Sequence, residues 1–446
     1  IRYDNDGLPR YGEFNYGPQK WIMNNFMISH KKATTLYDAL EIRLAHQFLE
    51  ESRISRSINK PKRQTRIEKV NAYSFNADFT KAINKKNIVF YGLEYILNDV
   101  DSEGIDTNII TGVNSVGPAR YPQAIWQSIG IYLNNEFKVS EKTVFQAGLR
   151  YNQFILKADF DTTFYPFPFT EANINKGSLT ASAGIVYSPT ENWILSSNLG
   201  SAFRAPNVDD IGKIFDSEPG SVVVPNPNLN AEYASNLDVN VARKFGKNIK
   251  VDVSDYYTLL QNAMVRRDFT LNGSSEIIYD GELSQVQAIQ NAAKANVYGF
   301  QAGIEVKSPS GFNFSTDLNF QKGEEELDNG DKSPSRHAAP FFGISRIGYE
   351  TSNFDFQVNV QFSDAVNFSD LAEEEKGKTE IYAKDKDGNP YSPSWYTLNF
   401  KTLYQLTNNF TITAGLENIT DQRYRPYSSG IVSPGRNFIL ALRAKF

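Results

Sequence analysis

Hydrophobic and polar residues alternate along almost the whole chain. Residues 354–362 show the pattern clearly, with Phe354, Phe356, Val358, Val360 and Phe362 separated by Asp355, Gln357, Asn359 and Gln361. The same period of two recurs in 410–417 and 438–446, whereas helical periodicity is nearly absent. This alternation is typical of β-strands with one apolar face and one polar face. The sequence therefore predicts an all-β protein.

The predicted strands are long. About seventeen segments carry the pattern, and strands in soluble sheets average roughly 5–6 residues whereas a tilted membrane strand needs roughly 9–11. Many of these segments span 10–16 residues, so their length favours strands that cross a bilayer. They are 19–30, 36–50, 63–81, 88–101, 122–139, 143–158, 176–188, 193–203, 232–245, 249–268, 291–307, 312–324, 339–350, 354–364, 395–406, 410–419 and 436–446.

The connections between these segments alternate between short and long. Short ones such as 84–87, 140–142 and 246–248 separate long ones such as 204–231 and 365–394. Bacterial outer-membrane barrels have short periplasmic turns and long outer loops, and the fixed repeat of a propeller is not found. The prediction is a transmembrane antiparallel β-barrel, favoured over a large soluble all-β protein.

The strand number and direction predict that residues 1–446 form part of a barrel. Bacterial single-chain barrels have an even number of strands, and seventeen is odd. The first predicted strand enters the short connection 31–35 and so runs towards the periplasm, as does the last, which ends at Phe446. A complete barrel that starts in the periplasm would open with a strand of the opposite direction. We therefore expect the chain to begin inside a barrel.

Composition narrows the classes of protein. The mean hydropathy of -0.44 fits an average over an apolar outer face, a polar lumen and long loops. The 446 residues include no cysteine and three histidines, and their net charge of -5 gives no basic footprint for nucleic acid. No zinc-protease or serine-hydrolase motif is present. The sequence predicts neither an enzyme, nor a resident cofactor or metal, nor a nucleic-acid partner.

Three motifs resemble those of the TonB-dependent outer-membrane receptors. They are the box 201–209 (Ser-Ala-Phe-Arg-Ala-Pro-Asn-Val-Asp), the box 226–229 (Asn-Pro-Asn-Leu) with Glu232, and the C-terminal run from Leu416 through Arg436 to Phe446. The resemblance covers essentially the whole chain. It implies a 22-stranded barrel, monomeric in the lipid of the bacterial outer membrane. It also implies that a plug domain, a segment that contacts TonB and about five first strands are missing from this chain.

The two boxes also suggest ligand contacts, because they look like the paired boxes of haem receptors in that family. We predict contacts from Phe203, Arg204, Asn226 and Asn228, and from His337 at the outer end of a strand. The segment 207–225 between the boxes contains no histidine, which counts against an imidazole-ligated haem site. Two alternatives remain open: the boxes stiffen a loop through their prolines, and His337 is an ordinary surface residue.

The function implied by the resemblance is active uptake of a scarce large nutrient, most simply an iron complex such as a siderophore or haem. Cobalamin, another metal complex and an oligosaccharide remain alternatives, as does passive diffusion through a porin-like channel. Polar residues on the inward face predict a polar lumen that contacts a plug and lines the path of the ligand. They are Arg150, Gln146, Asn152, Asp252, Asp317, Asn319, Lys401 and Arg443.

Overall fold

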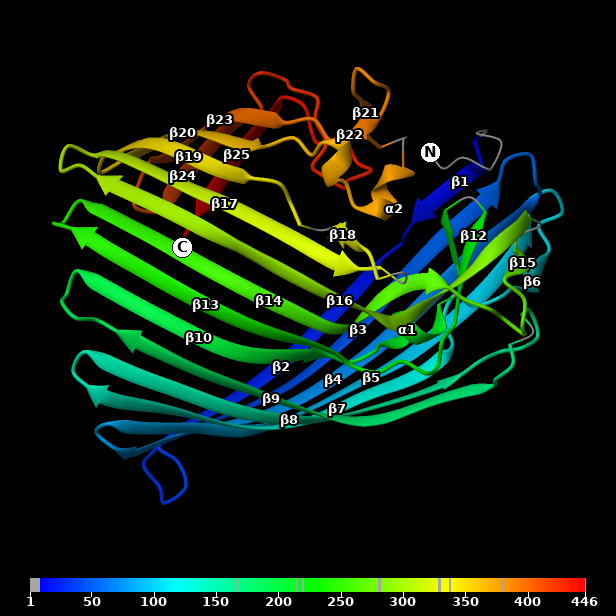
Figure 1. Cartoon of the computed structure of the whole chain (residues 1–446), viewed down its shortest axis with the longest axis horizontal. Helices are drawn as coiled ribbons and strands as arrows, with labels where there is room; N and C mark the ends of the chain where they lie inside the picture. The colour runs from blue at the N-terminus through cyan, green and yellow to red at the C-terminus, as the bar shows by residue number, and fades with distance from the viewer. Residues whose placement is uncertain are drawn as a thin grey trace.

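The structure is a computed structural model that describes residues 9–165, 167–213, 215–218, 220–279, 282–327, 330–336, 338–378 and 381–445. Nearly all regular structure in these residues is β-strand (Figure 1). None of the described helices is both long enough and apolar enough to cross a membrane.

In the residues that the structure describes, seventeen strand positions follow one another around the wall, in agreement with the seventeen segments predicted from the sequence. The first position is shared by β1 (Tyr11–Tyr16) and β2 (Lys20–Lys31), which both pair with β3. The others are β3 (Ala39–Ser57), β4 (Lys62–Asn84), β5 (Asn87–Asn108), β7 (Gln123–Ser140), β8 (Thr143–Asp159), β9 (Glu171–Tyr187), β10 (Trp193–Arg204), β13 (Glu232–Phe245), β14 (Ile249–Asp268), β16 (Glu282–Lys307), β17 (Phe312–Glu326), β19 (Phe342–Glu350), β20 (Phe354–Ser363), β23 (Trp395–Gln405), β24 (Phe410–Glu417) and β25 (Asn437–Ala444).

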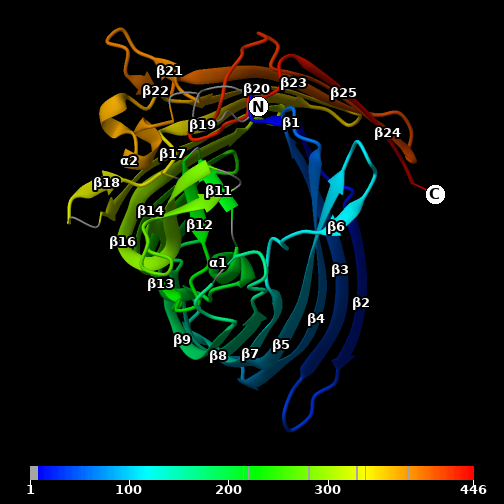
Figure 2. The same cartoon turned by 90° about the vertical axis from the view of Figure 1, so that its right-hand side faces the viewer.

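Each wall strand pairs antiparallel with the next one along the chain, and the sheet curves into a barrel wall (Figures 1 and 2). The short turns gather at the left-hand end of Figure 1 and the long loops at the right-hand end. Among the described wall strands, β25 pairs only with β24, and β2 pairs only with β3, as does β1 at the same wall position. These two strands are therefore the edges of the sheet.

The two faces of the wall differ as the alternation predicts. On the outward face Ile131 and Leu133 are 57% and 54% exposed, whereas the inward Ser128 and Asn152 are 6% and 4% exposed. Outward aromatic rings such as Phe79 and Tyr91, which stack with centroids 5.0 Å apart, resemble the girdles found at bilayer boundaries. The outward face is therefore suited to lipid.

The polar lumen predicted from the sequence is confirmed by paired inward side chains. Arg150 forms an ion pair with Glu94 at 2.6 Å, and the amide of Gln146 donates to Glu136 at 3.1 Å. On the other side of the lumen Arg346 pairs with Asp317 at 2.6 Å. These charges lie on a water-accessible inner face, where a bilayer does not penalise them.

Several strands continue beyond the length that a membrane requires. β4 has 23 residues, about twice the roughly 9–11 of a tilted membrane strand. On its outer part the outward Lys69 pairs with Glu103 of β5 at 3.0 Å, which marks a region outside the lipid. The strict alternation of short and long connections fails here, because β3 and β4 extend so far that the outer turn 58–61 suffices.

The loop 205–231 folds into the barrel instead of outward. It carries α1 (Val208–Gly212), β11 (Phe215–Glu218) and β12 (Ser221–Val224), which lie inside the ring of strands in Figure 2. β12 pairs in parallel with the outer end of β16, from Ser221–Gln285 to Val224–Ala288. The remaining loop elements are β6 (Asn114–Val116), β15 (Glu276–Tyr279), β18 (Lys332–Pro334), η1 (Phe368–Asp370), α2 (Glu373–Lys376), β21 (Ala383–Lys384) and β22 (Pro390–Tyr391).

Candidate functional site

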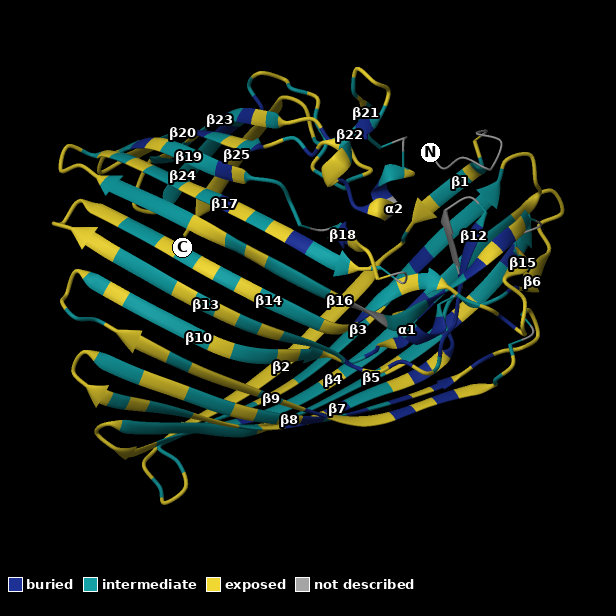
Figure 3. Cartoon of the chain, viewed as in Figure 1, coloured by how far each residue is buried: buried dark blue, intermediate teal, exposed yellow. Residues whose placement is uncertain are grey.

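A hydrophobic core fixes the inner loop against the wall. Phe154 and Leu156 of β8 are 1% and 0% exposed, and they pack in one cluster with Ile211 and Leu229 of the loop. Figure 3 shows these buried residues gathered at the outer end of the barrel, around α1. Because burial of each large apolar side chain is worth roughly 1.5–3 kcal/mol, the loop is a fixed part of the barrel interior.

This core was missed from the sequence although a signal was present. The inward residues of β8 change from polar at Arg150 and Asn152 to apolar at Phe154 and Leu156, while the outward Ile155 is also apolar. A segment that is apolar on both faces indicates burial on both sides. Here the second side is covered by the loop 205–231.

Phe203 and Arg204 of the first box lie at the end of β10, where the inner loop begins. The ring of Phe203 stacks on that of Phe154, with centroids 6.1 Å apart. The guanidinium of Arg204 pairs with Asp210 of α1 and with Glu232 at the start of β13, both at 2.6 Å. Arg204 thus joins the two ends of the loop to the helix between them.

The start of α1 is held by further hydrogen bonds. Asn207 caps the helix by accepting from the backbone N–H of Asp210 at 3.0 Å, and the carboxylate of Asp210 accepts from the N–H of Asn207 at 2.9 Å. The indole N–H of Trp126 donates to the carbonyl of Pro206 at 3.1 Å. Such a reciprocal cap satisfies backbone donors that a helix otherwise leaves free, so the loop start is tied to both the helix and the wall.

The hydroxyl of Tyr121 donates to Asp209 at 2.6 Å and links two outer loops. Burial opposes the charge of Asp209, but the hydrogen bonds from Tyr121 and Lys213 keep its pKa below the usual range. Burial and the same hydrogen bond raise the pKa of Tyr121. At neutral pH the pair is therefore a neutral phenol that donates to a carboxylate.

The second box, 226–229, lies at the opposite end of the loop, and its Asn226 side chain forms hydrogen bonds with backbone groups. The amide of Asn226, 8% exposed, donates to the carbonyl of Ile289 in β16 at 2.8 Å, and its oxygen accepts from the N–H of Asn228 at 3.1 Å. Asn228 itself is exposed. His337 lies outside the described residues. The structure thus brings Phe203 and Arg204 to one cavity and places Asn226 and Asn228 at the closure of the loop.

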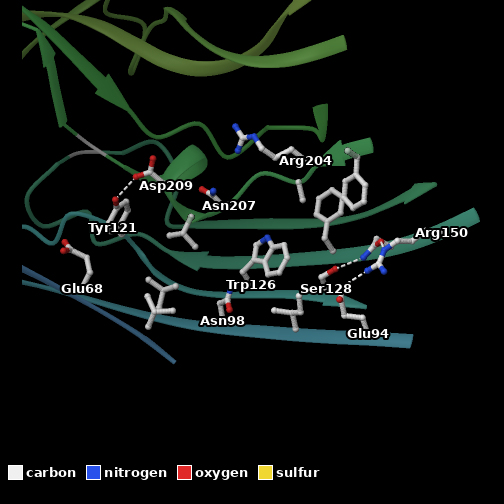
Figure 4. Close-up of a pocket in the computed structure, with 18 residues that line it drawn as sticks. Glu68, Glu94, Asn98, Tyr121, Trp126, Ser128, Arg150, Arg204, Asn207 and Asp209 are labelled. Carbon is white, nitrogen blue, oxygen red and sulfur yellow. Dashed lines mark hydrogen bonds and ion pairs between the residues drawn. The ribbon is translucent and has the colours of Figure 1, made fainter. Parts of the chain in front are cut away.

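That cavity has a volume of about 650 Å³ and lies between the wall and the start of the inner loop (Figure 4). Cavities that bind small molecules are typically of 300–1,000 Å³, mostly apolar and with a few convergent polar groups. Its apolar walls include Trp126, Phe154 and Phe203, and its charged groups are Glu68, Glu94, Arg150, Arg204 and Asp209.

A second cavity of about 650 Å³ lies on another part of the wall. It is lined by residues of β14, β16, β17, β19 and β20 together with Trp395 and Tyr427, and it includes the predicted lumen residues Asp252, Asp317 and Asn319. It contains neither of the two boxes.

Across the part of the chain that the structure describes, no group of three or more His, Cys, Asp or Glu side chains is placed to hold a metal ion.

Replacing Arg204 by Met is expected to lower the free energy that holds the inner loop in its inward fold by about 1 kcal/mol. The effect is small because the two ion pairs of Arg204 are partly exposed to water. The side chain of Arg204 is 45% exposed. Faster hydrogen exchange of the α1 amides would measure the effect. Lys307→Met is the control, because Lys307 also forms an ion pair but is 71% exposed and lies far from the loop. Equal exchange in both variants would contradict a clamping role for Arg204.

The outer loop 365–394 contains Glu375, a carboxylate that is held by ion pairs, as Asp209 is held by hydrogen bonds in the inner loop. The side chain of Glu375 is fully excluded from solvent and pairs with Arg336 at 2.7 Å and Lys378 at 2.6 Å; the hydroxyl of Tyr382 also donates to it. Burial opposes its charge, but the hydrogen bonds from Lys378 and Tyr382 and the charges of Lys378 and Arg336 keep its pKa below the ordinary 4.5.

This depressed pKa predicts acid sensitivity of the loop. The stabilisation by Glu375 is complete above the ordinary value of 4.5 and is lost as the pH falls through the lower value of the folded loop. Hydrogen exchange of the loop amides, corrected for intrinsic rates, is expected to rise in this acidic range. Glu375→Gln should raise exchange at neutral pH and remove most of the pH dependence; a wild-type loop equally protected on both sides of that range would refute the role.

The comparisons with known proteins agree with this geometry. The sequence matches the family described as "TonB dependent receptor-like, beta-barrel" over residues 2–419. The chain therefore belongs to the TonB-dependent receptor β-barrel family. This is a family of outer-membrane receptors and transporters of Gram-negative bacteria rather than of enzymes.

Two curated relatives are distant in sequence. The chain is 22% identical over 366 residues to the probable TonB-dependent siderophore receptor PiuA of Acinetobacter baumannii, covering 78% of this chain and 45% of that protein. It is 22% identical over 392 residues to the hemoglobin-haptoglobin-binding protein A of Haemophilus influenzae, covering 71% of this chain and 36% of that protein. The chain thus spans less than half the length of either relative.

Solved structures share the fold. The copper transporter OprC superposes with a TM-score of 0.78 at 14% identity, over 97% of this chain and 66% of that one. The siderophore receptor PiuA from Acinetobacter baumannii gives 0.67 at 15% identity, over 96% and 64%. At these identities the likeness establishes the barrel fold and leaves the ligand open.

Proposed function

We propose that the protein takes up an iron complex, a siderophore or haem, across the outer membrane of a Gram-negative bacterium with energy delivered by TonB. The observation that carries the proposal is the open cavity of about 650 Å³ between the wall and the inward-folded loop. Membership of a receptor family supports it, as do relatives described as a siderophore receptor and a hemoglobin-haptoglobin-binding protein.

The proposal extends to the whole receptor. Further strands would join the two sheet edges β2 and β25 to complete a 22-stranded, monomeric barrel in lipid, and a plug and a TonB-contacting segment would couple it to the inner membrane. The support is that each edge strand pairs on one side only and that the chain covers 66% of the copper transporter OprC. The paired polar residues of the inner wall would contact the plug.

Within this function Phe203 and Arg204 are proposed to contact the ligand, because both line the cavity. Asn226 and Asn228 are proposed to act by holding the loop closed, and His337 remains a proposed contact at the outer rim. Passive diffusion is less well supported, because the inner loop occupies part of the lumen (Figure 2).

The test is growth of iron-starved cells that depend on the full-length receptor for a supplied ferric complex. We expect growth on at least one ferric siderophore or haem, and loss of that growth when TonB is deleted. Uptake that continues without TonB would contradict the proposal and favour passive diffusion.

A further inference from the structure

Glu68 differs from the other charged residues that line the cavity, because its carboxylate has no hydrogen-bonding partner among the described residues. Glu94 and Arg150 pair with each other, Asp209 accepts from Tyr121, and Arg204 is held by Asp210 and Glu232. Both carboxylate oxygens of Glu68 are buried and accept no hydrogen bond in the described part of the chain. A buried ionised group without hydrogen-bonding partners is costly in free energy. A ligand group that donates hydrogen bonds to Glu68 would reduce this cost.

The position of Glu68 directs its carboxylate at the cavity. Glu68 is 8% exposed and lines the same cavity as Trp126 and Phe203. Figure 4 shows it beneath Tyr121 and Asp209, at the opposite end of the cavity from Arg150. It lies on the outer part of β4, one residue before the outward Lys69–Glu103 pair, and is therefore at the height where an external ligand arrives.

Three arginines act electrostatically on Glu68, but none of the three lines the cavity. Burial raises the pKa of Glu68, and Glu51, opposite it on β3, adds to this effect, whereas the charges of Arg120, Arg53 and Arg66 lower the pKa without cancelling the rise. Arg66 is engaged by Asp106 at 2.9 Å, and the guanidinium groups of Arg53 and Arg120 lie over the rings of Tyr16 and Tyr121. The arginines do not line the cavity, so the group that a ligand meets is the carboxylate.

We propose that this cavity binds a cationic amino group carried by the iron complex, with Glu68 as its counter-charge. The aliphatic or aromatic part next to the amine would pack against Trp126, Phe154 and Phe203. A protonated amine supplies the donors that both Glu68 oxygens lack, and a charge-assisted hydrogen bond is roughly twice as strong as a neutral one. This inference rests on the proposed function and names the chemistry of its ligand.

The test compares two ferric trihydroxamates that differ only at one end, one with a free primary amine and one with that amine acetylated. Binding of each to the purified full-length receptor is measured for wild type, Glu68→Gln and Glu103→Gln. Glu103 is the matched control, because it lies on the adjacent strand β5 but faces outward in its pair with Lys69. Wild type and Glu103→Gln should prefer the amine form about tenfold, the factor expected for one charge-assisted hydrogen bond.

In Glu68→Gln the two complexes should bind equally, and unchanged affinity for the acetylated form would show that the variant is folded. Equal affinities in wild type, or a preference that survives in Glu68→Gln, would overturn the inference while leaving the proposed function intact. If neither complex binds to any of the three proteins, uptake of such ferric complexes and the inference fail together.

Discussion

Leu156→Ala is expected to destabilise the inward fold of the loop 205–231 by roughly 2–5 kcal/mol, the usual range for truncating a buried leucine. The side chain of Leu156 is 0% exposed and packs in the same cluster as Ile211 and Leu229. Shortening it leaves a void between wall and loop that neither side can fill without moving. Hydrogen exchange of α1 in the full-length receptor should therefore become faster.

The matched control for this change is Leu149→Ala on the same strand. Leu149 is 54% exposed on the outward face, where lipid surrounds it, so its truncation should leave exchange of α1 unchanged. Loss of the loop fold should also weaken binding of any ligand that occupies the cavity, because the loop forms one of its walls. Protection of α1 that is equal in both variants would show that the loop is held by something other than this core.

Ile131→Lys is expected to lower the stability of the barrel in lipid by roughly 2–4 kcal/mol, the cost of a lysine on the lipid face near the middle of a bilayer. Ile131 is 57% exposed, and its partner on the next strand is the outward Tyr151. A charge at this position has no water and no carboxylate opposite it. Urea unfolding of the full-length receptor in vesicles measures the difference.

Gln146→Lys serves as the control, because Gln146 faces the lumen and its amide donates to Glu136 at 3.1 Å. A lysine there would meet a carboxylate in an aqueous interior, so we expect a change of less than about 1 kcal/mol, as for an exposed ion pair. If both lysines destabilised the barrel to the same extent, the assignment of the two faces would be wrong.

The wall could be predicted because its signal is local. Membrane strands alternate strictly between lipid and lumen, and each predicted segment overlaps an observed wall strand. The outer ends of some long strands were not predicted, because both of their faces are polar. The strand β5 was expected to end at residue 101 but continues to Asn108. Its last residues include the outward Glu103 and the inward Asp106. Water on both faces removes the alternation on which the prediction depends.

The inner loop could not be predicted, because its structure depends on partners that are distant in the chain. Ser221–Val224 has the composition of a short strand, but its partner is the segment from Gln285 to Ala288. Nothing in the spacing of those residues indicates a parallel pair across a loop. The second box shows the same limit, since the partner of Asn226 is the backbone carbonyl of Ile289, which has no sequence signature.

The sequence pointed to some of the residues that line the proposed site. Phe203 and Arg204 were expected to contact a ligand; both line the cavity of about 650 Å³ beside the inner loop, and their contact with a ligand stays a prediction. Glu68, Trp126 and Phe154 were not singled out, because they belong to three other strands that converge only after the wall has curved. The boxes therefore indicated where the loop begins and ends, whereas the cavity is built by the wall around it.

The position of bound iron tests the account most directly. Crystals of the full-length receptor soaked with a ferric complex that supports its growth should give an anomalous iron peak next to the cavity walled by Trp126, Phe154 and Phe203. An iron peak at the second cavity, beside Trp395 and Tyr427, would contradict the assignment of the binding site to the inner loop and its wall.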